Sequence, residues 1–178
     1  MLRRLAVGLL LSAWLSAQTP SPESLLRHAT ELQQAGDLER AEQAYRDFLA
    51  VRPNEVAVRS NLGVLLSRLG RYDQAVVEYK KALELEPTNA GIVLNLGLAY
   101  YKAGQIPQAA QAFSKARQIT PDNLQITLLL ADSELRLGHN SSVIQLLQPA
   151  EQQNADNLAI AYMLGMALIR DGQVQEGQ

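Results

Sequence analysis

The chain has 178 residues, of which 47% are hydrophobic and 19% charged, and it carries a formal net charge of −2 and no cysteine. This balance argues against sequence-independent nucleic-acid binding, which depends on an excess of basic residues, so we expect no nucleic-acid partner. Without cysteine, the chain cannot form disulfides, use a catalytic thiol or hold zinc through cysteine. Abundant Ala, Leu and Gln favour helices.

The beginning of the chain is organised differently from the rest. Two arginines precede an apolar run over residues 5–15, and small residues ending at Ala17 follow it. This order is typical of a secretory signal peptide, and the run has about half the length of a membrane-spanning helix. We predict a signal peptide over residues 1–17 and a linker over 18–21. The mature protein would then be exported, periplasmic or otherwise extracytoplasmic, and without an integral membrane segment; an uncleaved membrane anchor is the alternative.

A period of 34 residues runs through the rest of the chain. Four kinds of residue recur at this spacing: glycines, prolines, alanines and aromatic rings. They are Gly36, Gly70, Gly104, Gly138 and Gly172; Pro53, Pro87 and Pro121; Ala41, Ala75 and Ala109; and Tyr45, Tyr79 and Phe113. A period of this length indicates a repeat architecture in which each unit buries its apolar face against its neighbours.

Each period predicts two helices. Apolar residues follow helical spacing up to Leu69, where Gly70 supplies the left-handed backbone that ends a helix. A second helical pattern then runs until Pro87 stops it. Asparagines just after each proline are the expected N-caps of the next unit, at Asn54, Asn89 and Asn123.

These residues resemble the tetratricopeptide repeat, whose pattern is W-x2-L-G-x2-Y, then A-x3-F, then P. The third unit is closest to it, with Leu96-Gly97, Tyr100, Ala109, Phe113 and Pro121. The resemblance implies an all-α, right-handed superhelical solenoid. We place its array over residues 22–178, with repeats at about 22–55, 56–89, 90–123 and 124–157 and a partial repeat at 158–178.

The fourth and fifth units depart from this pattern. Glu134 stands in place of the aromatic residue and Ala155 in place of the proline, and Pro149 falls inside a helix, where it predicts a kink or an early end. Solenoids normally finish in a polar capping helix, and none precedes Gln178. We therefore expect the natural protein to continue, with a frayed end or one covered by a partner as the alternatives.

No catalytic constellation is found in the sequence. Neither His28 nor His139 has a paired acid beside it, and no cluster has metal-ligand spacing, so we expect no cofactor and no enzymatic activity. Residues 140–142 match a glycosylation sequon, but capping of a helix start is the preferred interpretation.

The resemblance implies that the first helix of each unit lines a concave surface that binds ligands. From the third unit onward this face is apolar, which marks an interaction site. Cations recur at the 34-residue period beside this face. A cation near the end of a helix also interacts favourably with the helix dipole, which is the alternative explanation for them. Two asparagines also repeat there and would suit the backbone of an extended peptide, but only two units carry them. The peptide-binding residues that we predict are Asn61, Arg68, Asn95, Leu98, Tyr101, Lys102, Leu128, Arg136, Tyr162 and Arg170.

A non-catalytic scaffold that holds a protein or peptide partner is the function that we predict. The cation clamp that some family members use for a terminal carboxylate is not matched, because Leu26, Thr30 and Gly91 occupy its polar positions. The alternatives are a docking module of a larger enzyme or secretion machine whose active part lies beyond residue 178, and an architectural spacer.

Overall fold

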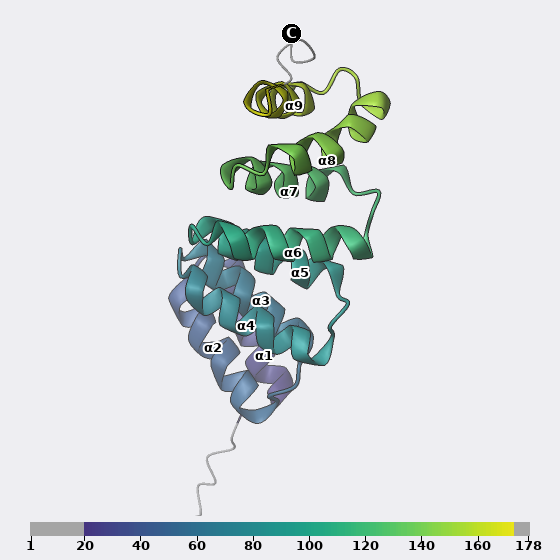
Figure 1. The fold of residues 1–178 in the computed structure, drawn as a ribbon. Coiled ribbons are helices and arrows are strands. Elements are labelled where there is room, and N and C mark those ends of the chain that lie inside the picture. The colour runs from purple at the N-terminus through teal and green to yellow at the C-terminus, as the bar shows by residue number, and fades with distance from the viewer. Residues whose placement is uncertain (1–19, 173–178) are drawn as a thin grey trace, which may run out of the picture.

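The computed structural model describes residues 20–172, which form a stack of antiparallel helix pairs without any strand (Figure 1). The predicted signal peptide lies outside the described residues. Figure 1 shows successive pairs rotated about the stack, so that α9 is seen end-on while α6 is seen from the side. The predicted all-α repeat solenoid is confirmed. The helices are α1 (Pro22–Gln34), α2 (Leu38–Val51), α3 (Val56–Arg68), α4 (Tyr72–Leu85), α5 (Ala90–Lys102), α6 (Ile106–Ile119), α7 (Leu124–Arg136), α8 (Asn140–Gln153) and α9 (Leu158–Arg170).

The periodic glycines occupy the turn after the first helix of each unit. Gly70, for example, has a φ of 74°, and within residues 20–172 only the five periodic glycines have positive φ. A side chain is strained in this left-handed conformation, so the glycine is required where the chain reverses.

Asparagine side chains cap three of the first helices. Asn89, Asn123 and Asn157 precede α5, α7 and α9, and each accepts a hydrogen bond from a backbone N–H of the first turn. The prediction for Asn54 is wrong, because α3 begins after Glu55, which makes no side-chain cap. Glu55 lies 34 residues before Asn89 and is therefore the equivalent position.

The early end predicted for α8 is also wrong. This helix runs through Pro149 to Gln153 and has 14 residues, as many as α6. One lost hydrogen bond does not end a helix whose other face is anchored by buried Val143 and Leu147. The predicted capping by residues 140–142 is absent, since His139 is the N-cap residue and its side chain makes no cap hydrogen bond.

The buried core is divided along the stack. One cluster of buried side chains spans α1 to α6 and reaches Leu130 of α7, and a second joins α7, α8 and α9. A small cluster of Val93, Ala116 and Ile126 lies between α5, α6 and α7. The first and the small cluster both cross the junction after α6, and the second cluster begins at Ala131, so the two parts of the core meet at α7.

Within a pair, close approach depends on a glycine beneath an aromatic ring. A Cβ atom on Gly63 would lie 2.6 Å from the ring of Tyr79, and one on Gly97 would lie 2.6 Å from the ring of Phe113. In the fourth unit, Ala131 and Leu147 occupy the equivalent positions, and both are fully buried. In the fourth unit the extra methyl is thus accompanied by a smaller partner, whereas in the first unit Ala29 and Tyr45 occupy these positions, so the glycine contact is a feature of the second and third units.

We predict that Gly97→Ala destabilises the array by about 1–3 kcal/mol, because the new methyl overlaps the Phe113 ring. Phe113→Leu alone leaves a cavity, whereas the double variant recreates the Ala131–Leu147 pair. Urea unfolding should therefore give a double-variant loss smaller than the sum of the single losses by more than about 0.5 kcal/mol. Additive losses would contradict this packing.

A buried ion pair ties the second unit together. The Glu78 side chain is 6% exposed, and its carboxylate lies 2.8 Å from Arg59 Nη1 and 3.2 Å from Lys81 Nζ. Arg59 Nε also donates to the carbonyl oxygen of Pro53 at 2.8 Å. Arg59 therefore connects α3, α4 and the loop after α2.

Glu78→Gln should lower the free energy of unfolding by on the order of 2 kcal/mol, because it leaves the half-buried Arg59 without an opposite charge. Glu84→Gln, at an exposed position of the same helix, is the matched control. Urea unfolding measures both variants, and equal losses would show that the pair does not hold the unit together.

Candidate peptide-binding groove

The first helices of successive units lie next to one another along one side of the stack. α5 contacts α3, and α9 contacts α7. Because the 34-residue period repeats the same helical register, equivalent side chains fall in rows across these helices. The predicted site residues all belong to these first helices.

A hollow of about 290 Å³ lies between α3 and α5; we call it the α3–α5 hollow. It brings together four of the predicted residues: Arg68, Asn95, Leu98 and Lys102. Its remaining walls are Val64, Ser67, Tyr72, Tyr79 and Ala99. The sequence analysis did not predict Tyr72, which is the first residue of α4. It lies two residues after the turn at Gly70, and this position could have indicated that its side chain is close to the end of α3.

A second hollow of about 320 Å³ adjoins the first and includes Asn61 and Asn95. Asn95 lines both hollows, so they share one wall. Within residues 20–172, neither asparagine side chain makes a hydrogen bond to another protein group. Each amide can therefore donate and accept, as the backbone of an extended segment requires.

The row of predicted cations divides into two kinds. Arg68 and Lys102 are exposed, and in the described part of the chain neither forms an ion pair. Arg136 differs, since its Nε donates to Asp132 Oδ2 at 2.9 Å. Two cations without a described ion-pair partner therefore lie at the α3–α5 hollow, and Arg170, exposed at the end of α9, is a third.

Tyr101 joins α5 to α7. Its hydroxyl donates to Asp132, and the guanidinium of Arg136 lies over its ring, with Cζ 4.9 Å from the centroid. On the other side, the Tyr101 and Phe113 ring centroids are 6.5 Å apart. Burial, and then the neighbouring Asp132 carboxylate, raise the pKa of Tyr101. Tyr101 is therefore a brace between units as well as part of the groove wall.

The remaining predicted residues lie toward α9. Leu128 is half-buried and packs against the α7–α9 core, so it has a structural role. Tyr162 is 66% exposed and shares an apolar face of α9 with Leu158 and Ile169. Arg170 is exposed at the end of that helix. The α3–α5 hollow does not include these residues.

One of the two histidines differs from the sequence expectation. His28 is exposed on α1. His139 does have an acid beside it, because its Nδ1 lies 2.6 Å from Glu134 Oε2. Between residues 20 and 172 no three acidic or histidine side chains gather as metal ligands would, and no helix there is long and apolar enough to cross a bilayer.

The fold and its hollows define a helical-repeat solenoid with a groove along its first helices. Two family models match the chain, "TPR repeat" over residues 67–104 and "Tetratricopeptide repeat" over residues 90–123. Residues 67–123 therefore form tetratricopeptide repeats, which confirms the resemblance predicted from the sequence. Proteins of this architecture generally use their concave surface for binding.

Solved structures share this fold. A crystal structure of MamA protein has a TM-score of 0.80 and 20% identity, covering 88% of this chain and 85% of that chain. MamA from Desulfovibrio magneticus RS-1 has a TM-score of 0.69 and 22% identity, with 78% and 79% covered. A tetratricopeptide repeat protein from Parabacteroides merdae has a TM-score of 0.77 and 19% identity, with 88% and 62% covered. A comparison with curated proteins gave no match.

Asp132→Asn should lower the pKa of Tyr101, because the neutral amide no longer opposes the phenolate. In the wild type the raised pKa means that the folded protein favours the protonated Tyr101 hydroxyl. The folding free energy that this group contributes is therefore present below the ordinary tyrosine pKa of about 10, and it is lost as the pH rises through the raised pKa. NMR titration of the Tyr101 ring carbon measures the shift. Asp122→Asn, outside this cluster, should leave it unchanged; equal effects would contradict the contact.

Proposed function

We propose that this chain is a non-catalytic scaffold that binds a segment of a partner protein along its first helices. The observation that carries the proposal is the α3–α5 hollow, which apolar Leu98 lines together with Arg68 and Lys102, two cations that form no ion pair with the described residues. Exposed apolar surface rimmed by polar groups is typical of an interaction site.

The side chains that line the groove indicate which kind of partner segment would bind there. The α3–α5 hollow has room for an apolar side chain, and its two cations favour an acidic residue next to that side chain. Asn61 and Asn95 suit the backbone of an extended segment. Affinity for a short peptide would be about micromolar, or roughly −8 kcal/mol.

We further propose that the protein works outside the cytoplasm. The support is the basic, apolar and small-residue order of residues 1–17 in the sequence. Amino-terminal sequencing of the protein recovered from an envelope or periplasmic fraction checks this, and a mature chain that begins at Gln18 is the expected result. A cytoplasmic chain that still begins at Met1 would overturn it.

Peptides selected from a random display library against residues 18–178 should carry an apolar residue close to an acidic one. The double variant Arg68→Glu, Lys102→Glu should weaken the binding of these peptides at least tenfold, because it reverses both charges at the α3–α5 hollow. Fluorescence anisotropy with the selected peptides measures the change.

The matched control is the double variant Lys80→Glu, Lys115→Glu, which makes the same charge change on the second helices α4 and α6. It should leave affinity within about twofold, allowing for long-range screening by salt. Equal weakening by both double variants, or selected peptides without acidic residues, would count against the groove.

A further inference from the structure

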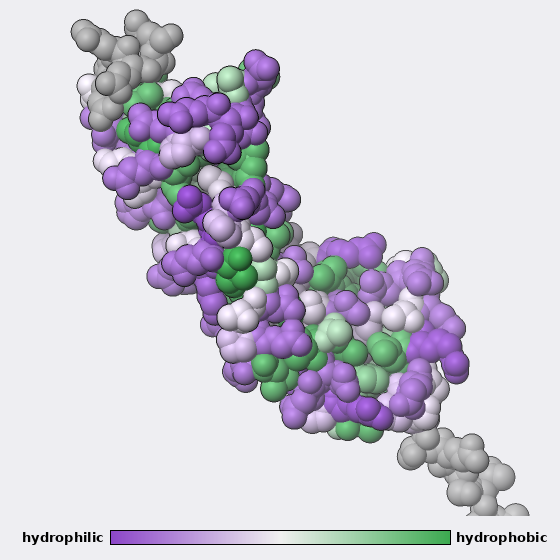
Figure 2. All heavy atoms as spheres, turned by 90° about the vertical axis from the view of Figure 1, so that its right-hand side faces the viewer, coloured by the Kyte–Doolittle hydropathy of each residue, from purple (hydrophilic) through white to green (hydrophobic). Residues whose placement is uncertain are grey.

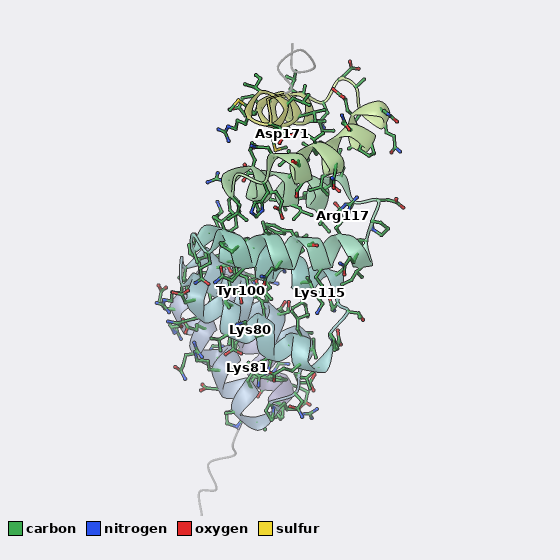
Figure 3. All side chains as sticks on the ribbon, viewed as in Figure 1. Lys80, Lys81, Tyr100, Lys115, Arg117 and Asp171 are labelled. Atoms are coloured by element: carbon green, nitrogen blue, oxygen red, sulfur yellow. The ribbon has the colours of Figure 1, made fainter. Side chains whose placement is uncertain are left out.

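A separate hollow of about 440 Å³ lies where the end of α6, the start of α7 and the end of α8 meet. Arg117, Asp122, Leu124, Thr127, Pro149 and Asn154 are among the residues that line it. Figure 3 shows Arg117 between α6 and the α7–α8 pair, and Figure 2 faces the edge of the stack that carries the α6–α7 connection. None of the groove residues lines this hollow.

Arg117 is an unusual residue for its position. The equivalent residues of the first two units are Leu49 and Leu83, which pack against the core. The Nε atom of Arg117 is buried and donates no hydrogen bond to any described protein group. A buried donor without an acceptor costs on the order of 1–3 kcal/mol, which leucine would avoid.

A second departure from the repeat faces the same hollow. Pro149, the proline inside α8, lies in its wall. The hollow also lies at the junction after α6, next to the small cluster of Val93, Ala116 and Ile126. Local departures from a sequence pattern that converge on one place indicate a functional site.

The charges around Arg117 favour an anion. Leu124, the first residue of α7, lines the hollow, and the first turn of α7 carries no acidic residue to offset the positive end of its dipole. Asp122 is the one carboxylate among the lining residues; it is exposed, and no ion pair joins it to Arg117. The guanidinium group presents several N–H donors in a planar fork that matches an oxyanion.

We propose that this hollow binds an oxyanion, the carboxylate or phosphate group of a ligand, through Arg117. The site is independent of the groove, and a partner bound in the groove does not need it. Nε itself is buried, so the terminal Nη groups of the guanidinium are the donors that an oxyanion in the hollow would meet.

The test is NMR titration of the labelled protein with sodium phosphate and, separately, with sodium acetate, at ionic strength held constant with sodium chloride. The Arg117 Nε–H and the backbone N–H signals of Leu124 and Gln125 should shift and saturate with at least one anion. The anion that saturates at the lower concentration identifies the preferred oxyanion. Shifts that grow linearly with both anions would overturn the proposal.

Two variants with opposite expected effects sharpen the test. Arg117→Leu restores the residue of the first two units and should weaken the Leu124 and Gln125 response at least tenfold. Asp122→Asn removes the lining carboxylate and should strengthen binding severalfold. An unchanged response in Arg117→Leu, or weaker binding in Asp122→Asn, would overturn the site.

Two controls separate this site from other effects. Arg40→Leu, at an exposed arginine whose side chain is 69% accessible, should leave the titration unchanged. The groove variant Arg68→Glu, Lys102→Glu should also leave it unchanged, so failure of the groove proposal and failure of this one are distinguishable. Loss of the response in either control would mean that general electrostatics cause the shifts.

Discussion

The structure depends on how closely the two helices of a unit approach each other. In the second and third units a ring lies directly on the backbone of a glycine, Tyr79 on Gly63 and Phe113 on Gly97. That contact sets the distance between the two helices of these units. The groove residues point where they do because every first helix is held in the same register.

The groove is not uniform along its length. Near α3 and α5 it carries two cations and two amides for which the described residues provide no ion-pair or hydrogen-bond partner, beside an apolar hollow. Between α5 and α7, Tyr101 and Arg136 both donate hydrogen bonds to Asp132. The positive charge of Arg136, which we predicted to face a ligand, is therefore already paired with a carboxylate. Toward α9 the exposed surface becomes apolar, as Tyr162 and Ile169 show.

The 34-residue period was sufficient to predict the fold and the turn glycines, because glycine, ring and proline positions report directly on backbone geometry. Errors occurred where side chains from different units meet. Arg136 is paired with Asp132 of the same helix, but its contact with the ring of Tyr101 joins two units, and Tyr72 reaches the α3–α5 hollow from a second helix. The tolerance of Pro149 depends on packing around α8, which a single-helix rule does not include.

The brace between α5 and α7 makes the two ends of the groove different from each other. Because Arg136 is paired with Asp132, the cations of the row that have no ion-pair partner among the described residues are Arg68 and Lys102 at the α3–α5 hollow and Arg170 at the end of α9. The α9 end therefore carries one cation together with the exposed apolar side chains of Leu158, Tyr162 and Ile169. In the proposed scaffold the two ends of the row are unequal, so a bound segment with unevenly spaced acidic residues would favour one chain direction.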